Sequence, residues 1–278
     1  MKFVNGKKIA DEILEGLKER IASLDRRPKL VVFLAGENSA SLSYIKMKQK
    51  RAEEIGAQVE IRRYPAGVDD AKLGEEIERA NNEKSVSGII VQLPLPKHIN
   101  RDKILNTVDP RLDVDCLTEA NKIRLNTGEP YFLPPAAAAV LKILEYYNIA
   151  LHDKNILLVG SGDLIGKPLA AILHSRQIDF HLANRQTEDL TELTLKADII
   201  ITGAGQPGLI TGQMIKPDSV IIDAGTTGSD DGQIVGDVDG QSVMGKAALL
   251  APVPGGVGPI TVAMLLSNVM KADKFTDR

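Results

Sequence analysis

The sequence has little that would serve a secreted, membrane-spanning or metal-binding protein. Its single cysteine, Cys116, excludes an intramolecular disulfide, and its four histidines show no spacing typical of metal ligands. No apolar run approaches the ~20 residues needed to cross a bilayer, and the N-terminus lacks the apolar core of a signal peptide. These absences predict a cytoplasmic protein with no membrane association and no bound metal.

The sequence also has no excess of one charge. Its 34 basic and 37 acidic residues are mixed along the chain, so no basic stripe is present to neutralise a phosphate backbone. Nucleic acid is therefore not expected as a partner. With 43% hydrophobic residues and no low-complexity segment, the chain is typical of globular proteins. Its 278 residues favour two domains.

Strands and amphipathic helices alternate in the first half of the chain. After an N-terminal helix, the expected elements are strands at 30–35, 59–64 and 87–95, with helices at 39–55 and 69–82. This order is typical of a parallel sheet with helical crossovers, whose ligands bind beyond the carboxyl ends of the strands. Tyr44, Lys48 and Gln92 all fall at or just after such ends.

Tyr44 and Lys48 are one helical turn apart and should share a face of the second helix. A lysine becomes an acid–base catalyst when burial lowers its pKa, and a tyrosine one turn earlier can form a wall of its pocket. The alternative is that Lys48 belongs, with Lys46, Lys50 and Arg51, to the solvated face of this helix. From this stretch alone, both interpretations stay open.

The middle of the chain is less regular. Residues 99–108 predict a short helix and residues 121–132 a polar connector. Asp115 lies between them and is a candidate functional carboxylate, although loop carboxylates are more often solvated or capping. Pro134-Pro135 and the following alanines predict a helix to about Asn148, because proline is tolerated in a first turn and alanine favours helix. We expect the passage between domains in this helix.

A glycine-rich turn joins a strand to a helix in the second half. Residues 155–159 predict the strand, Gly160-Ser161-Gly162-Asp163-Leu164-Ile165-Gly166 the turn, and residues 167–176 the helix. In this context, backbone amides and the helix N-terminus can bind a pyrophosphate. The spacing is one residue longer than the usual dinucleotide fingerprint, so a plain tight turn remains the alternative.

The next strand, expected at residues 179–183, ends in Asn184 and Arg185. A site specific for NAD carries an acidic residue about 20 residues past the glycines. Arg185 instead favours the 2'-phosphate of NADP. Because Asn184 can hydrogen-bond a ribose, NAD remains possible.

Later strands run into glycines, which leave room for a flat ligand. These strands are expected at 198–201, 220–222 and 248–252. Asp230-Asp231-Gly232 predicts the turn of a small hairpin. Three glycines between Pro254 and Pro259 form a loop of bare backbone, followed by an apolar helix from Ile260 to about Ala272.

Five segments, in this order along the chain, match a known family. They are Tyr44-x-x-x-Lys48, Val91-Gln92-Leu93-Pro94-Leu95-Pro96, Asp113-Val114-Asp115, Gly236-Asp237-Val238 and Pro252-Val253-Pro254-Gly255-Gly256-Val257-Gly258-Pro259-Ile260-Thr261. The chain resembles the bifunctional methylenetetrahydrofolate dehydrogenase/methenyltetrahydrofolate cyclohydrolases over nearly its whole length. The resemblance implies an α/β fold of two domains with the active site in the cleft between them, and a homodimer. A parallel α/β catalytic, folate-binding domain would comprise residues 1–134 plus 262–278, and a Rossmann-type NAD(P)-binding domain residues 135–261.

The resemblance also implies a role for particular residues. Lys48 would be the catalytic lysine, Gln92 the glutamine that hydrogen-bonds it, Tyr44 the tyrosine that stacks on the folate, and Asp115 the acid that anchors the pterin. The remaining implied site residues are Gly255, Gly256 and Val257 in the folate pocket, with Thr261 and the backbone at Thr226 near the nicotinamide. The implied activity is NADP-dependent oxidation of 5,10-methylenetetrahydrofolate to 5,10-methenyltetrahydrofolate, followed by hydrolysis to 10-formyltetrahydrofolate.

The chain departs from the family pattern in several places. Residues 134–139 lack the threonine of the family's Pro-Cys-Thr-Pro-x-Gly segment, Cys116 stands where glycine is usual, and Thr226-Thr227 where Ile-Asn is common. These departures motivate an alternative, a folate-binding paralogue with cyclohydrolase activity only or little dehydrogenase activity. Short-chain dehydrogenases also use Tyr-x-x-x-Lys, but their glycine-rich loop precedes that pair, whereas Gly160 follows it here.

Overall fold

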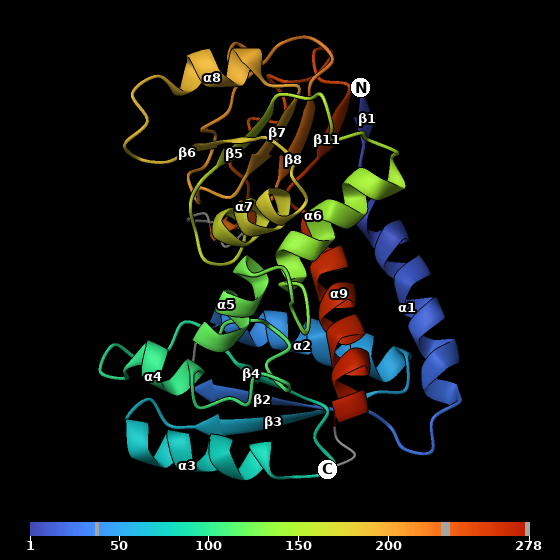
Figure 1. Ribbon diagram of the computed structural model, residues 1–278, viewed down its shortest axis with the longest axis vertical. Coiled ribbons are helices and arrows are strands. Elements are labelled where there is room, and N and C mark those ends of the chain that lie inside the picture. Colours follow the sequence, from blue (N-terminus) through green and yellow to red (C-terminus); the bar gives the residue numbers. More distant parts are fainter. Residues whose placement is uncertain (37–38, 229–233, 276–278) are drawn as a thin grey trace. The chain divides into compact units, whose positions relative to one another are not determined.

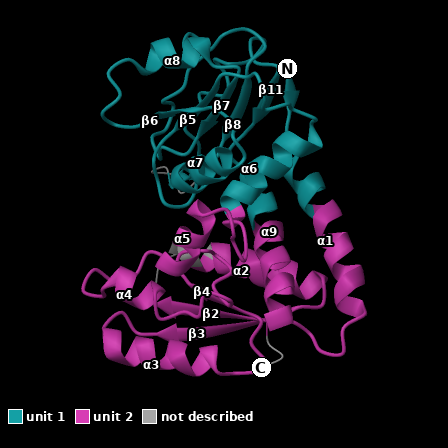
Figure 2. Ribbon diagram, in the orientation of Figure 1, with its two compact units in different colours: residues 1–10, 136–261 teal, residues 11–135, 262–278 magenta. Residues whose placement is uncertain are grey.

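The computed structural model describes residues 1–36, 39–228 and 234–275 (Figure 1). The chain forms two compact units, shown in Figure 2. Unit 1 comprises Met1–Ala10 and Ala136–Thr261, and unit 2 comprises Asp11–Pro135 and Val262–Arg278. The chain passes from one unit to the other inside α1 (Gly6–Ala22), at the start of α6 (Pro135–Tyr146) and inside α9 (Val257–Ala272).

The compact units divide the chain differently from the expected domains at the N-terminus, because residues 1–10 cluster with unit 1 and not with the unit that carries Lys48. The reason is β1 (Lys2–Phe3), which pairs in parallel with β11 (Leu249–Ala251). A two-residue strand with both side chains exposed has no apolar pattern, so this pairing left no signal in the sequence.

Unit 2 contains the predicted parallel sheet. The sheet order is β3-β2-β4, formed by β3 (Gln58–Tyr64), β2 (Lys29–Ala35) and β4 (Gly88–Val91). The apolar side chains of β2 alternate between two core clusters, one on each face. One cluster includes residues of α3 (Asp70–Asn81) and α4 (Arg101–Leu105), and the other includes residues of α2 (Ser39–Glu54) and α9. Burial on both faces explains the unbroken apolar run of β2.

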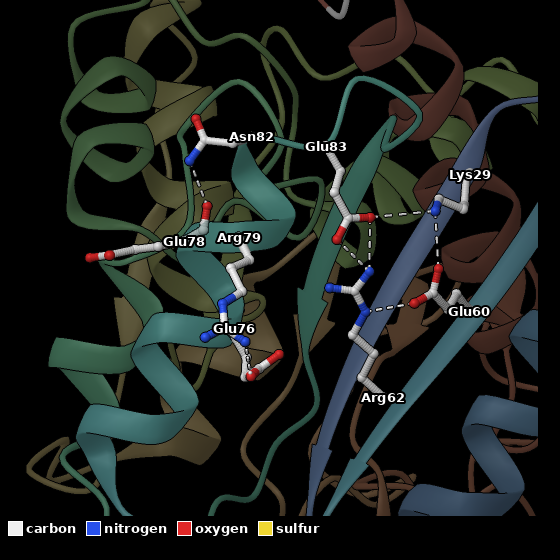
Figure 3. Close-up of polar contacts among 8 residues, drawn as sticks. All are labelled: Lys29, Glu60, Arg62, Glu76, Glu78, Arg79, Asn82 and Glu83. Atoms are coloured by element: carbon white, nitrogen blue, oxygen red, sulfur yellow. Dashed lines mark hydrogen bonds and ion pairs between the residues drawn. The ribbon is translucent and has the colours of Figure 1, made fainter.

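A ring of ion pairs reinforces the edge of this sheet (Figure 3). The guanidinium of Arg62 on β3 donates to Glu60 at 2.6 Å and to Glu83, just after α3, at 2.7 Å. The Nζ atom of Lys29 on β2 lies 3.0 Å from Glu60 and 3.6 Å from Glu83. The four side chains therefore join two strands to the end of a helix, and their charges compensate one another.

One element of unit 2 was mispredicted. Residues expected in a polar connector form the helix α5 (Glu119–Asn126), whose N-cap hydroxyl on Thr118 accepts the Asn121 N–H at 3.2 Å. Ile123 is exposed and Leu125 is buried, so the helix shows no apolar period. Its capping threonine was the available sequence signal.

Unit 1 is built on a six-stranded parallel sheet in the order β1-β11-β8-β7-β5-β6. Its remaining strands are β5 (Ile156–Val159), β6 (His181–Ala183), β7 (Ile199–Thr202) and β8 (Val220–Asp223). The chain adds β6 on one side of β5 and then β7 and β8 on the other. The direction of winding therefore reverses between β5 and β7, which is where such sheets bind their ligands.

Two helices follow the first strands of this sheet. They are α7 (Gly166–Ser175) after β5 and α8 (Leu190–Lys196) after β6. An antiparallel pair, β9 (Thr227–Gly228) and β10 (Ile234–Val235), flanks the predicted hairpin turn, which itself lies outside the described residues. Within the described part of the chain, no helix combines the length and apolar character required to span a membrane.

Candidate active site

Lys48 is buried on α2, with only 6% of its surface exposed, whereas Lys46 and Lys50 on the same helix are exposed. The helix directs Lys48 toward the side that also buries Ile45 and Ala52. An unpaired ammonium is costly to bury. The interpretation of Lys48 as a solvated surface charge is therefore wrong, while it holds for its two neighbours.

Three groups surround the Lys48 amine. Its Nζ atom lies 3.5 Å from Oε1 of Gln92 and 5.3 Å from the centroid of the Tyr44 ring. Burial lowers the pKa of Lys48, and the negative charge of Asp115 opposes part of this shift. An amine with a lowered pKa can exist in its neutral, basic form closer to neutral pH.

Gln92 is held by the end of the sheet. Its backbone N–H donates to the Phe33 carbonyl at 2.9 Å, which extends the contact between β4 and β2 by one residue. Its side-chain NH₂ donates to the Leu93 carbonyl at 2.8 Å, so Oε1 is the atom turned toward Lys48. Because this oxygen only accepts, the amine of Lys48 must donate to it. The remaining N–H groups and the lone pair of the neutral amine stay available for substrate or water.

The carboxylate of Asp115 accepts no hydrogen bond from the residues that the structure describes. Burial raises the pKa of Asp115, Lys48 opposes the shift and Asp113 reinforces it. Burial and then Asp115 raise the pKa of Tyr44 to about 12, so the tyrosine keeps its proton over the ordinary pH range. Asp115 is thus a partly buried acceptor, free for a ligand that carries N–H groups.

Residues not singled out by the sequence fix the backbone around Asp115. The buried carboxylate of Asp113 accepts from the Leu117 N–H at 3.2 Å, the Thr118 N–H at 2.8 Å and the Asn121 side chain at 2.9 Å. These bonds tie the segment to the start of α5. The Asp113-Val114-Asp115 match pointed to this segment but gave Asp113 no role.

A second anchor comes from α9. The amide of Asn268 donates to the carbonyls of Val114 and Leu133, both at 2.9 Å. Cys116, on the other side of Asp115, has φ 59, in the left-handed region that favours glycine. No local pattern could reveal Asn268, since 154 residues separate it from Val114.

The glycine-rich turn of unit 1 depends on its first and last glycines. A Cβ atom on Gly166 would lie 1.9 Å from the Gly160 carbonyl oxygen, and one on Gly160 would lie 2.7 Å from the Gly203 oxygen. Gly162 has nothing within 4 Å of such an atom. Ser161 and Gly162 are exposed, and Asp163 pairs with Lys167 at 2.8 Å. The tight packing leaves a bare-backbone cradle before α7, which fits a pyrophosphate.

Asn184 and Arg185 lie just after β6 and are exposed. The Asn184 oxygen accepts the Gln186 N–H at 2.8 Å, so it already supports its own turn. The Arg185 guanidinium has no hydrogen-bond or ion-pair partner among the described residues, so it remains free to bind an anion. This charge pattern favours a phosphate over a free ribose hydroxyl.

The remaining predicted residues also belong to unit 1. The Gly255 carbonyl accepts the Gly6 N–H at 2.9 Å, and the Gly256 N–H donates to Pro252 at 2.8 Å. Val257 begins α9, where its carbonyl accepts the Thr261 hydroxyl at 3.1 Å, and Thr226 is exposed after β8. The structure thus groups Tyr44, Lys48, Gln92 and Asp115 in unit 2, and the predicted cofactor residues with the 255–257 loop in unit 1.

One α/β unit holds a buried lysine beside an amide and a carboxylate. The other holds a glycine cradle at the switch point of a parallel sheet. Together they define a two-domain α/β enzyme with a nucleotide cofactor. Family profiles match both parts of the chain. Residues 4–115 match the catalytic domain, and residues 134–277 the NAD(P)-binding domain, of tetrahydrofolate dehydrogenase/cyclohydrolase. The chain belongs to the tetrahydrofolate dehydrogenase/cyclohydrolase family.

Full-length relatives support this assignment. The chain is 39% identical over 277 residues to the bifunctional protein FolD of Nautilia profundicola, covering 99% of this chain and 98% of that protein. The FolD methylenetetrahydrofolate dehydrogenase/cyclohydrolase of Campylobacter jejuni superposes with a TM-score of 0.95 at 37% identity, covering 99% of each chain. The Trypanosoma brucei FolD, solved with NADP and an inhibitor, gives 0.94 at 34%, covering 99% of this chain and 98% of that one.

Proposed function

We propose that this enzyme oxidises 5,10-methylenetetrahydrofolate with NADP and then hydrolyses the resulting 5,10-methenyltetrahydrofolate to 10-formyltetrahydrofolate. The observation that carries the proposal is the buried amine of Lys48 facing Gln92 and Asp115. The bifunctional relatives give no support to the alternative of a paralogue with cyclohydrolase activity alone.

The residues of unit 2 suit both half-reactions. Asp115 accepts N–H groups of the pterin, and Tyr44 offers its ring as a wall against which the folate stacks. Holding the one-carbon bridge in place matters most for the oxidation, because loss of a hydride leaves a delocalised cation and requires no proton transfer from the protein.

Hydrolysis needs proton transfers, and Lys48 can perform them. Neutral Lys48 takes a proton from the water that attacks the one-carbon atom. The resulting ammonium then returns a proton to the folate nitrogen as its bond to that carbon breaks, while the hydroxyl on that carbon releases its proton to solvent and becomes the formyl carbonyl. Gln92 orients the amine throughout, since its Oε1 atom accepts one of the N–H groups.

NADP fits the residues of unit 1. When bound, it accepts the hydride from the folate. The Gly160 turn and the start of α7 would hold the pyrophosphate, Arg185 the 2'-phosphate, and the backbone at Thr226 together with Thr261 the nicotinamide side. Gly255, Gly256 and Val257 would shape the folate pocket, as the family resemblance implies.

Replacing Lys48 tests its proposed role. We expect Lys48→Met to lower the rate of methenyltetrahydrofolate hydrolysis by about 10²- to 10⁴-fold, the contribution of a positioned acid–base group. The loss of methenyl absorbance measures the rate of hydrolysis. Lys46→Met, on the exposed face of the same helix, serves as the matched control and should hydrolyse at the normal rate. Near-normal hydrolysis by Lys48→Met would remove Lys48 from the mechanism.

Arg185→Ala tests the cofactor. A charge-assisted bond to a phosphate contributes about 1.5–3 kcal/mol, so the Michaelis constant for NADP should rise roughly 10- to 100-fold. NAD lacks this phosphate, so its Michaelis constant is the internal control and should not change. Equal use of both cofactors by the unaltered enzyme, with no effect of the substitution, would exclude the phosphate role.

We also propose a homodimer. In support, β3 lies at the edge of its sheet, where an unpaired strand offers its backbone groups to another chain. Light scattering coupled to gel filtration should give twice the 30.0 kDa mass of one chain. A mass of a single chain at micromolar concentration would contradict the dimer.

A further inference from the structure

Two carboxylates are buried in unit 1, and neither has a role in the chemistry above. Asp223 ends β8, and Asp237 is the central residue of the Gly236-Asp237-Val238 match. Their exposed fractions are 2% and 0%. Buried carboxylates are expensive unless each is well supplied with donors.

Asp237 collects donors from the loop after β7. Its Oδ2 atom accepts the Thr202 hydroxyl and the Ala204 N–H, both at 2.7 Å, and its Oδ1 atom accepts the Gln206 N–H at 2.8 Å. An ionised carboxylate is the side chain that can accept all three bonds at once without presenting a donor. The course of residues 203–206 is therefore fixed by one charged group.

Asp223 in turn fixes Asp237. Its Oδ1 atom accepts the backbone N–H of Asp237 at 3.1 Å and that of Gly225 at 3.0 Å, and its Oδ2 atom accepts the Val238 N–H at 2.9 Å. The end of β8 thus locates the backbone that carries the second acid. The two carboxylates form a chain of hydrogen bonds from β8 to the loop after β7.

Glycines leave the space that the two carboxylates occupy. A Cβ atom at Gly225 would lie 2.3 Å from Oδ1 of Asp237, and one at Gly236 would lie 2.0 Å from Oδ2 of Asp223. The acids and the glycines therefore form one packed unit, and the requirement for glycine in the Gly236-Asp237-Val238 match follows from the neighbouring carboxylate.

The loop held by Asp237 borders the cofactor cradle. Its first residue, Gly203, donates its N–H to the Val159 carbonyl at 2.9 Å, and its carbonyl oxygen would lie 2.7 Å from a Cβ atom on Gly160. This is the point between β5 and β7 where the winding of the sheet reverses. Residues 203–206 are thus placed to form one side of the crevice that opens at the Gly160 turn.

We propose that Asp237, located by Asp223, is a positioning residue for the dinucleotide: it holds the loop after β7 in the shape that the cofactor contacts. The inference rests on the proposed binding of NADP to unit 1. It predicts that loss of the carboxylate impairs cofactor binding and the dehydrogenase reaction, while hydrolysis at Lys48, which uses no dinucleotide, is preserved.

The primary test is Asp237→Asn. Either orientation of the new amide turns its NH₂ toward a backbone N–H, at Ala204 or at Gln206, so one of the two bonds is lost. We expect the dissociation constant of NADP, measured by calorimetry, to rise at least 10-fold, with a lower dehydrogenase kcat. The kcat/KM of the cyclohydrolase should stay within about twofold. Hydrogen exchange at Ala204 and Gln206 should accelerate in the variant.

Two further variants complete the test. Asp198→Asn removes a carboxylate from the opposite end of β7, where it accepts the Asn155 N–H at 2.7 Å, and should leave NADP affinity unchanged. Thr202→Val removes one donor to Asp237 and keeps the shape of the side chain. It should weaken NADP binding about threefold with normal hydrolysis, and it decides the question if Asp237→Asn does not fold.

Three outcomes would overturn the positioning role. The first is unchanged NADP affinity in the folded Asp237→Asn variant or, if that variant does not fold, in Thr202→Val. The others are loss of both activities in the same proportion and an effect of Asp198→Asn on NADP affinity equal to that of Asp237→Asn. Failure of the proposed function looks different, because the unaltered enzyme would then neither bind NADP nor form the reduced cofactor.

Discussion

Lys48 and Asp115 each shift the protonation of the other. Burial lowers the pKa of the amine and raises that of the carboxylic acid, and the attraction between their charged forms opposes both shifts. The pair therefore sets the fraction of neutral lysine available for proton transfer. A carboxylate placed there to bind substrate also adjusts the basicity of the catalytic group.

Asp115→Asn should change the pH profile of hydrolysis. Removing the negative charge removes the contribution that raises the pKa of Lys48, so neutral lysine will persist to lower pH. The acidic limb of kcat for the cyclohydrolase should therefore move to lower pH, while the KM for the folate rises. The profile is measured with saturating methenyltetrahydrofolate.

A surface substitution controls for the change in net charge. Glu53→Gln removes the same charge from an exposed position near the end of α2 and should leave the acidic limb in place. If Asp115→Asn moves the limb upward or not at all, the limb does not report Lys48.

For single residues, the helix pattern alone could indicate Lys48 but could not choose between its two interpretations, whereas the family resemblance implied the catalytic role. The spacing of Tyr44 and Lys48 was visible, yet only tertiary packing distinguishes a buried amine from Lys46 and Lys50 nearby. The roles of Asp113 and Asn268 could not be predicted for another reason. Both act through hydrogen bonds to backbone atoms, which the residue type does not reveal.

The helix α7 depends on the glycines that precede it. Gly166→Ala would place a methyl group 1.9 Å from the Gly160 carbonyl, a backbone atom that cannot move without displacing the end of β5. Overpacking of this kind costs about 1–3 kcal/mol. We expect lower stability to urea and weaker NADP binding, because the helix start that faces the pyrophosphate is displaced.

Gly162→Ala is the matched control for this element. The same methyl group meets no atom within 4 Å there, so urea stability should change by only a few tenths of a kcal/mol. Similar losses for both variants would mean that the turn tolerates no side chain anywhere, and that the Gly160–Gly166 contact is not the cause.

Elements were predictable where burial imposes a pattern. β2, β5, β7 and β8 are buried apolar runs ended by glycine or polar residues, so their places followed from the sequence pattern. α5 was missed because a short helix with one buried leucine has no apolar period. β1 was missed because its pairing partner, β11, lies at the far end of the chain.

At the scale of the whole molecule, the chain builds each unit from separated segments. Three passages between the units make the sheet of unit 1 depend on the first residues of the chain and the core of unit 2 on the last helix. The order of motifs along the sequence predicted two α/β domains, but the exchange of the N-terminal residues required the pairing of β1 with β11. Stability is therefore a property of the complete chain.

Asp223 should make that stability depend on pH. Burial, its largest influence, raises the pKa of Asp223 from 3.8 to about 6, although three backbone N–H groups oppose the shift. Between these values the folded state keeps a proton that the unfolded state releases, so stability falls as pH rises through this window. The contribution is fully present below about pH 4 and is lost above about pH 6, a change on the order of 3 kcal/mol.

Asp223→Asn, which cannot titrate, isolates this contribution. Hydrogen exchange of the slowest amides in β7 and β8 gives the free energy of global opening for both proteins at pH 4.5 and pH 7. Groups that do not interact with Asp223 titrate alike in the two proteins and cancel in the difference. The advantage of the unaltered protein over the variant should therefore be larger at pH 4.5 than at pH 7 by about 2 kcal/mol. A difference that does not change with pH would mean that Asp223 is ionised throughout, and that its three N–H donors outweigh the effect of burial.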